Sequence, residues 1–369
     1  MITMTNVLKR GRTVWDRDLL PEDEYVERVR AAREVMRAQG LDALVAVGHT
    51  TRYGNLTWLS GNVPPLGWMA VVLGLEGDPV LVTGGGSRDL PFLRTVTWIE
   101  AIRPSPSLFA GPAEGVSATL AAFLSPGAKV ALVGAREELA PAAHGELLAA
   151  LRDYAVIERD DLLAGLRAVK RPRELLALGR AYEIAHGAAE AALERFAEGG
   201  SNAAALLEGE HVARLHGCRD VRVLGNVAGP ALAPVEGGDD ERAGRLTIYC
   251  AVEYLGYWAQ ACACSARAGA AQRALRAMVE AAAPGVALSE LAAGATAELP
   301  AGEDDVALAY GLGGAIGLDL DERPRVEAGS GDVLAEGAVL ALQVITVEDG
   351  EPACAGTTLR VVAGGVAPL

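Results

Sequence analysis

Two short apolar runs in the second half of the chain face each other across a turn. Residues Leu246–Val252 and Tyr257–Cys264 alternate in polarity and contain aromatic side chains, and Glu253–Gly256 separates them. This pattern predicts a β-hairpin. Neither strand carries an acidic residue. Because successive strand residues point to opposite faces, the inward face of the hairpin is expected to carry Tyr249, Gln260, Cys262 and Cys264.

In the first part of the chain, apolar strands alternate with helical stretches. A helical pattern opens at Pro21 and closes at Gly40, as is typical of a helix end. Alternating strands and helices indicate an α/β layer domain, which we place over residues 1–164. The expected strands are residues 42–47, Trp68–Leu75, Pro79–Thr83, Val96–Ile102 and Lys129–Val133.

The character of the sequence changes near residue 165, where a second domain (165–369) is expected to begin. Residues 170–200 form a long, Ala-rich amphipathic pattern with Pro172 near its start and a glycine pair at its end, which predicts a helix. Helical and strand patterns are mixed over the remainder of the chain, so this domain is expected to be α+β. The further helices are expected at 202–216, 267–282 and 287–298, and the further strands at Val221–Leu224, Val306–Tyr310, Val339–Ile345 and Leu359–Val362.

Composition and charge exclude several classes of protein. The chain has a net charge of −15 and no basic run, which argues against nucleic acid or an anionic membrane as a partner. No apolar run reaches the ~18 residues of a membrane span, and the first residues do not resemble a signal peptide. The five cysteines are an odd number without a secretory context, so we expect reduced thiols and a cytoplasmic protein.

Several separate stretches together resemble the creatinase / Xaa-Pro peptidase family. They are "GLRAVKRPRELLALGRAYEIAHGA", "CAVEYLGYWAQ", "GLGGAIGLDLDERP" and "LAEGAVLALQV", and upstream "RYGNLTWLSGN" is similar to the family's amino-terminal domain. The resemblance runs over about residues 20–365. It implies an α/β amino-terminal domain, a carboxy-terminal domain with the pita-bread fold, and a homodimer.

The same resemblance shows what this chain has changed. Metallopeptidases of the family bind two divalent metals through two Asp, one His and two Glu, ligands that suit such ions and let them activate water. None of the five corresponding positions keeps its metal-binding group, so we expect no metal and no other cofactor. The residues that stand there are Tyr249, Gln260, Gly314, Gln343 and, with a less secure alignment, Thr357.

Two further family histidines are also replaced. One falls near residues 231–238, which contain no His, and the other is Asp321. Creatinase itself works without metal through the upstream histidine, so that route is absent here in its known form. Asp319, Asp321 and Glu322 form an acidic cluster, and one of them could serve as a general acid or base if burial raises its pKa. The alternative is a solvated turn before Pro324.

The catalytic candidates are therefore Tyr249, Gln260, Gln343 and Asp321, and the alternative for the first three is drift in a dead site. Cys262, Tyr310 and Glu322 are candidate substrate-binding residues. In creatinase-like dimers the amino-terminal domain helps to line the partner's cleft, so the loop residues His49, Arg52 and Tyr53 are expected to reach substrate in trans. The alternative is an ordinary loop.

The cysteines allow three readings. In the first reading, the cysteines are buried inert thiols. In the second, one of them is a nucleophile. In the third, a zinc ion is bound by Cys250, Cys262, Cys264 and Cys354. The two-residue spacing of Cys262 and Cys264 does not match the usual zinc pattern.

The residues are compatible with two hypotheses for function. The first is a metal-independent enzyme that acts on a small amine- or amino-acid-derived molecule by hydrolysis, elimination or cyclisation, in specialised-metabolite biosynthesis. The second is a catalytically inactive pseudopeptidase that binds a peptide or protein. A cleft with convergent polar groups favours the first hypothesis, and a cleft filled by apolar side chains favours the second.

Overall fold

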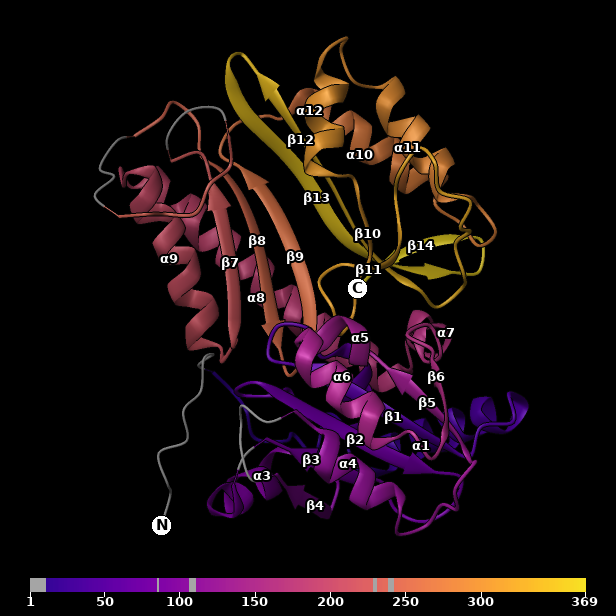
Figure 1. Cartoon of the computed structure of the whole chain (residues 1–369). Helices are drawn as coiled ribbons and strands as arrows, with labels where there is room; N and C mark the ends of the chain where they lie inside the picture. Colours follow the sequence, from indigo (N-terminus) through magenta and orange to yellow (C-terminus); the bar gives the residue numbers. More distant parts are fainter. Residues whose placement is uncertain (1–10, 85, 106–110, 228–230, 238–241) are drawn as a thin grey trace. The chain divides into compact units, whose positions relative to one another are not determined.

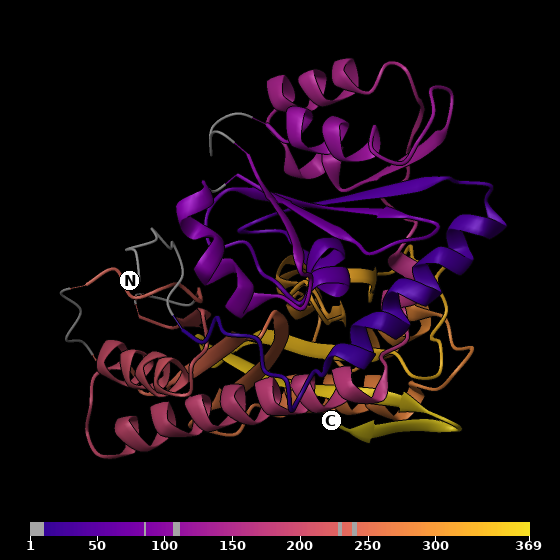
Figure 2. The same ribbon diagram turned by 90° about the horizontal axis from the view of Figure 1, so that it is seen from below.

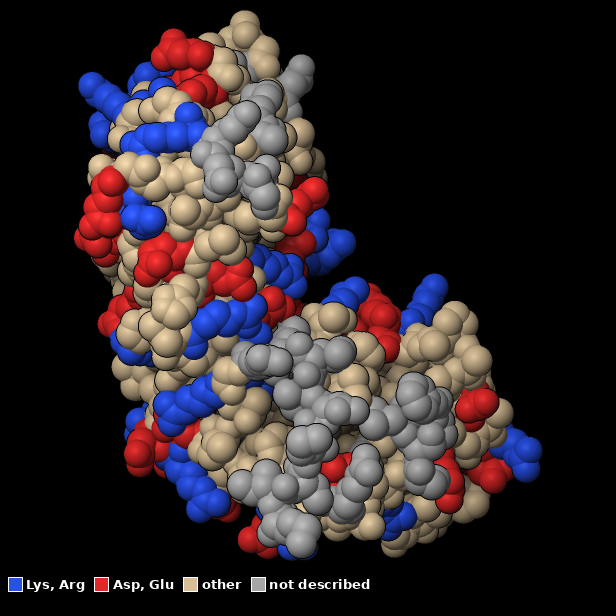
Figure 3. All heavy atoms as spheres, turned by 90° about the vertical axis from the view of Figure 1, so that its left-hand side faces the viewer, with Lys and Arg blue, Asp and Glu red and all other residues tan. Residues whose placement is uncertain are grey.

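The computed structural model describes residues 11–84, 86–105, 111–227, 231–237 and 242–369 (Figure 1). The chain forms two compact units, Met1–Arg167 and Ala168–Leu369. In the described part of the chain, no helix has the length and apolar character that crossing a membrane requires. On the face drawn in Figure 3, acidic and basic side chains lie interspersed among the described residues.

The first unit is built on a six-stranded mixed sheet in the order β4-β3-β2-β1-β5-β6. β1 lies between an antiparallel and a parallel neighbour and is buried along nearly its whole length, which explains its continuous apolar run. The strands are β1 (Ala43–His49), β2 (Trp68–Gly74), β3 (Val80–Thr83), β4 (Ala101–Pro104), β5 (Lys129–Val133) and β6 (Ala155–Glu158). The helices are α1 (Glu22–Ala38), α2 (Gly54–Ser60), α3 (Leu90–Val96), α4 (Ala113–Leu120), α5 (Ala135–Glu138), α6 (Pro141–Ala150) and α7 (Ala164–Ala168), with a short 3₁₀ turn at Ser87–Asp89.

The second unit contains two antiparallel sheets, in the orders β7-β8-β9 and β11-β10-β12-β13-β14. Two helices, α8 and α9, pack against the first sheet, and Figure 2 shows α8 running along it. The helices are α8 (Pro172–Ala197), α9 (Asn202–Leu215), α10 (Gly269–Ala281), α11 (Leu288–Ala297) and α12 (Glu303–Tyr310). The strands are β7 (Asp220–Gly225), β8 (Thr247–Tyr254), β9 (Tyr257–Cys264), β10 (Gly313–Ala315), β11 (Glu322–Arg325), β12 (Val339–Glu348), β13 (Glu351–Val362) and β14 (Gly365–Pro368).

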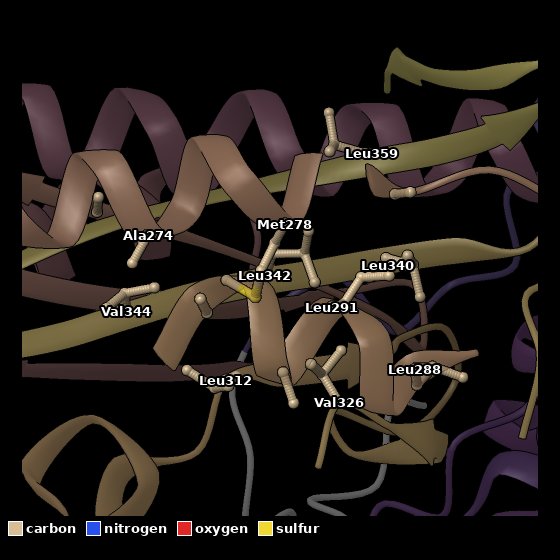
Figure 4. Packing of buried hydrophobic residues seen from close by; sticks show 14 of the residues in the cluster. Ala274, Met278, Leu288, Leu291, Leu312, Val326, Leu340, Leu342, Val344 and Leu359 are labelled. Atoms are coloured by element: carbon tan, nitrogen blue, oxygen red, sulfur yellow. The ribbon is translucent and has the colours of Figure 1, made fainter. Parts of the chain in front are cut away.

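The core of the five-stranded sheet decides which residues of β12 remain for a site. Leu340, Leu342 and Val344 are buried in one cluster with residues of α10 and α11 (Figure 4). Because side chains alternate along a strand, Ala341, Gln343 and Ile345 must face the other side of the sheet. Burial of the apolar set thus presents Gln343 to the opposite face.

Two predicted strands are wrong. Residues 306–310 form the end of α12, which Gly311 terminates with a φ of +78°. A run of five apolar and aromatic residues fits a strand or a short helix equally. In the helix, Ala307 is fully buried in the core. The predicted strand 96–102 is instead the end of α3, an irregular segment and the start of β4; the indole of Trp98 in that segment donates a hydrogen bond to the carbonyl of Leu59 (2.8 Å).

Candidate functional site

The β8–β9 hairpin holds the centre of the site. Its turn, Leu255-Gly256, has positive φ at both residues (53° and 91°), which suits a tight two-residue hairpin connection. The register pairs Tyr249 with Cys262 and Ala251 with Gln260. Tyr249, Cys262 and Gln260 therefore share one face, as the alternation predicts.

Three of the predicted residues form a chain of hydrogen bonds on this face, which we call the amide relay (Tyr249, Gln260 and Gln343). The Tyr249 hydroxyl donates to Gln260 Oε1 (2.9 Å), and Gln260 Nε2 donates to Gln343 Oε1 (3.1 Å). Gln343 Nε2 in turn donates to the backbone carbonyls of Tyr310 (3.2 Å) and Gly311 (3.4 Å). The relay joins the two sheets of the unit through side chains far apart in the sequence.

The relay lies at the wall of two adjoining cavities, which share Tyr249, Tyr310, Leu320 and Gln343. The larger cavity has a volume of about 550 Å³ and is lined mainly by apolar side chains. Its charged lining residues are Glu210 and Arg222. The smaller has a volume of about 260 Å³ and adds polar groups of Gln260, Asp321 and Arg325. The apolar lining of the larger cavity is Leu206, Leu207, Val221, Val223, Leu224, Leu232, Pro234, Val235, Leu320 and Ile345.

The two tyrosines at the cavities differ in their bonding. Burial raises the pKa of Tyr249 well above its usual value, and the neighbouring Cys262 thiol adds to the shift, so the phenol is uncharged near neutral pH. The Tyr310 oxygen accepts a hydrogen bond from the backbone N–H of Leu232 (3.0 Å). Tyr249 thus acts as a neutral hydrogen-bonding group, and Tyr310 is already bonded to the backbone.

Asp321 and Glu322 are adjacent in sequence but differ in environment. The Asp321 side chain is 60% exposed, lines the smaller cavity and pairs with Arg325. Glu322 is buried, pairs with Lys170 Nζ (2.6 Å) and accepts a hydrogen bond from the backbone N–H of Leu318 (3.1 Å). Glu322 is not among the residues that line either of these two cavities, and its contacts are those of a structural ion pair.

The cysteines lie on two faces of the hairpin. Cys250 directly follows Tyr249, which shares the face of Cys262, so Cys250 points to the opposite face and the four-cysteine zinc site is wrong. Burial raises the pKa of Cys218 and of Cys250 to about 12. Contact with the Cys262 thiol, together with burial, raises the pKa of Cys354. Protonated thiols at these three positions match the reading of buried inert cysteines.

The amino-terminal candidates His49, Arg52 and Tyr53 lie in the first unit. Arg52 pairs with Glu137 (2.6 Å) and Glu138 (3.2 Å), and Tyr53 is buried. Partial burial lowers the pKa of His49. Their approach to a partner's cleft stays a prediction.

Two parts of the site have no counterpart in the sequence-based predictions. The backbone carbonyls of Tyr310 and Gly311 anchor the relay, although only the Tyr310 side chain is predicted to bind substrate. The apolar wall contributed by α9 is also missing from the predictions. One sign of this wall could have been found in the sequence, because Leu207 is a large apolar residue away from the apolar face of an amphipathic helix. In the structure it is 51% exposed.

Comparison with known proteins decides the family. The model of metallopeptidase family M24 matches residues 177–366, which is more than half of the 369 residues. The chain belongs to metallopeptidase family M24. No curated protein gives a significant match to this M24 chain.

Several solved structures share the fold of this chain over more than nine-tenths of its length. The prolidase from Pyrococcus horikoshii OT3 matches with 18% identity and a TM-score of 0.74, over 92% of this chain and 97% of that one. The X-Pro aminopeptidase from Thermotoga maritima MSB8 matches with 17% identity and a TM-score of 0.76, over 92% and 96%. The amino-terminal domain of the FACT complex subunit SPT16 from chickpea, Cicer arietinum, matches with 16% identity and a TM-score of 0.66, over 93% and 94%. These similarities show an α/β amino-terminal domain followed by a pita-bread domain, as the sequence predicts.

The two-metal centre of M24 metallopeptidases does not fit the residues of this chain. The register pairs Gln343 with Gly356, so Gly356 rather than Thr357 faces the relay, and the alignment of the final ligand with Thr357 is wrong. A Cβ added at Gly356 would lie 2.7 Å from Cys262 Sγ, and one added at Gly314 would lie 2.7 Å from the Pro324 carbonyl oxygen. The donors that remain are a neutral phenol and two amides whose oxygens are used within the relay. Such a set lacks the charged oxygen and imidazole ligands of a two-metal site.

Proposed function

We propose that this M24 chain is a metal-independent enzyme that acts on a small amine- or amino-acid-derived molecule held in the cavities of its pita-bread domain. The observation that carries the proposal is the amide relay at the cavity wall. Its three side chains stand at positions that the family resemblance aligns with metal ligands. A chain of mutually satisfied buried polar groups is ordered and specific. It keeps the site polar without the charge that metal ions would need.

The chemistry assigned to the site is hydrolysis, elimination or cyclisation, in specialised-metabolite biosynthesis. Tyr249, Gln260 and Gln343 would hold the substrate through neutral hydrogen bonds. Asp321, at the smaller cavity, would move a proton, with Arg325 close enough to stabilise its charged form. The proposal includes a cytoplasmic homodimer in which His49 and Arg52 reach the partner's cleft; a monomer by light scattering would contradict that part.

The test is a comparison of variants on amine- and amino-acid-derived molecules, with products followed by mass spectrometry in the presence of a chelator. Turnover should persist with the chelator and fall at least tenfold in Tyr249→Phe, Gln343→Leu and Asp321→Asn. Tyr182→Phe, a tyrosine on α8, serves as the matched control. Wild-type rates in all three variants would show that the relay is not the active site, and turnover abolished by the chelator would contradict metal independence.

A pseudopeptidase that binds a peptide or protein is the second candidate. The largely apolar lining of the larger cavity favours it, because an apolar wall supplies affinity without chemistry. The similarity in fold to the amino-terminal domain of SPT16, a subunit of a complex, is compatible with it. Turnover of any small molecule at the relay would reject this candidate.

A further inference from the structure

The hydrogen bonds of the amide relay have a fixed direction. A backbone carbonyl can only accept, so the Gln343 amide must turn its nitrogen toward Tyr310 and Gly311. Its oxygen then faces Gln260, whose nitrogen must donate to it. The remaining oxygen of Gln260 requires a donor, and Tyr249 supplies it.

This direction determines what Tyr249 offers to the cavity. Its single hydroxyl hydrogen is used within the relay, so only the lone pairs of its oxygen remain. Among the described residues, no donor is bonded to that oxygen. Tyr249 therefore presents an acceptor, and a ligand must bring an N–H or O–H group to it.

Tyr310 presents the opposite polarity. Its oxygen already accepts the N–H of Leu232, and its own hydroxyl hydrogen remains to donate. Both tyrosines line both cavities. The two tyrosines of the shared wall thus offer one acceptor and one donor.

The charges around the cavities favour a neutral ligand. An ammonium group that leaves water needs a counter-ion, and burial without one is strongly unfavourable. The ionised side chains that line the cavities already lie beside opposite charges. These pairs are Glu210 with Arg214 (3.3 Å), Arg222 with Asp220 (3.7 Å), and Asp321 with Arg325.

We infer that the site recognises an uncharged secondary amide or lactam on an apolar body, with its N–H on the Tyr249 oxygen and its carbonyl on the Tyr310 hydroxyl. This inference rests on the proposed function, because it names the substrate class of the same site. The apolar lining of the larger cavity would hold the remainder of the molecule.

Three probes test the inference by isothermal titration calorimetry with the full chain. They are the cyclic dipeptide cyclo(Leu-Pro), its isosteric analogue in which an ester oxygen replaces the N–H, and linear Leu-Pro with its free ammonium and carboxylate. Wild type should bind the amide at least about tenfold more tightly than the ester, because the ester sets an oxygen against the Tyr249 oxygen. The amide should also bind more tightly than the linear dipeptide.

Variants separate relay direction from mere packing. The amide-to-ester ratio should fall toward one in Tyr249→Phe, which lacks the acceptor. It should also fall in Gln343→Leu, because the relay loses its carbonyl anchor and the Tyr249 hydrogen can turn to the cavity. Tyr182→Phe should keep the ratio, and the melting temperature of each variant shows that it is folded.

Three results would contradict the inferred amide or lactam recognition. Equal affinity for amide and ester, tighter binding of linear Leu-Pro, or no binding of any probe would overturn it. Equal affinities would leave the proposed metal-independent function standing. Two tightly bound metal ions per chain would instead overturn the proposed function, whatever the probes do.

Discussion

Glu322 and Asp321 show how the environment of a single residue decides its role. Both belong to the acidic cluster of Asp319, Asp321 and Glu322 that the sequence predicts as a source of a general acid or base. Glu322 faces Lys170 in the interior, where an ion pair is sensitive to the loss of either partner. Asp321 stands at the surface beside Arg325, where ion pairs contribute little to stability.

Replacing each acid by its amide should therefore change the stability of the protein by very different amounts. Glu322→Gln removes the buried carboxylate charge that faces Lys170 Nζ at 2.6 Å and should destabilise the protein by roughly 3–5 kcal/mol. Asp321→Asn should change stability by less than about 1 kcal/mol and act, if Asp321 moves a proton, on turnover alone. Urea unfolding of the two variants measures both free energies, and similar values for the two would contradict this assignment.

At the scale of elements, strand β10 depends on glycine. Gly313 has a φ of +90°, and a Cβ added there would lie 1.9 Å from the Ala341 carbonyl oxygen of β12. The strand lies just after Gly311, whose carbonyl helps to anchor the relay. Close approach of β10 to β12 thus sets both the sheet and the end of the relay.

Gly313→Ala should destabilise the protein by more than about 2 kcal/mol, because backbone strain and a steric clash each contribute roughly 1–3 kcal/mol. Gly329→Ala is the matched control, since a Cβ there meets nothing within 4 Å and its φ is not positive. The control should stay within about 0.5 kcal/mol of wild type. Chemical denaturation of both proteins is the measurement, and an unchanged midpoint for Gly313→Ala would show that β10 can move away from β12.

At the scale of the whole molecule, the changed ligand set predicts the metal content of the protein. Glycines at two positions and neutral groups at three leave no charged ligands for divalent ions. Elemental analysis of the purified chain should find no stoichiometric Mn, Co or Zn, and Xaa-Pro peptides should not be cleaved with or without added metal. About two ions per chain would mean that residues other than these hold them.

Alkaline pH should destabilise the fold through its buried thiols. The pKa of Cys218 and Cys250 is raised to about 12 in the folded chain, whereas an unfolded cysteine titrates near 9. Above pH 9 the unfolded state therefore holds fewer protons than the native state, and stability falls as pH rises toward 12. Melting temperatures measured from pH 8 to 11 should decline less in a Cys218→Ser, Cys250→Ser double variant; an equal decline would assign the effect to other groups.

The local pattern of residues determines much of this protein, and tertiary structure decides the remainder. Apolar alternation places Tyr249 and Gln260 on one face of a hairpin because strand periodicity is a local property. The order of several motifs indicates the family, and the matched model and shared fold confirm it. The short apolar stretch 306–310 misleads, because five such residues fit a strand or a helix equally and only tertiary packing decides between them. Likewise, whether Gly356 or Thr357 faces the relay depends on the register of β12 and β13, which a one-residue slip would invert. The direction of the relay depends on two carbonyls that meet Gln343 across more than thirty residues of sequence, a contact that only the folded chain can make.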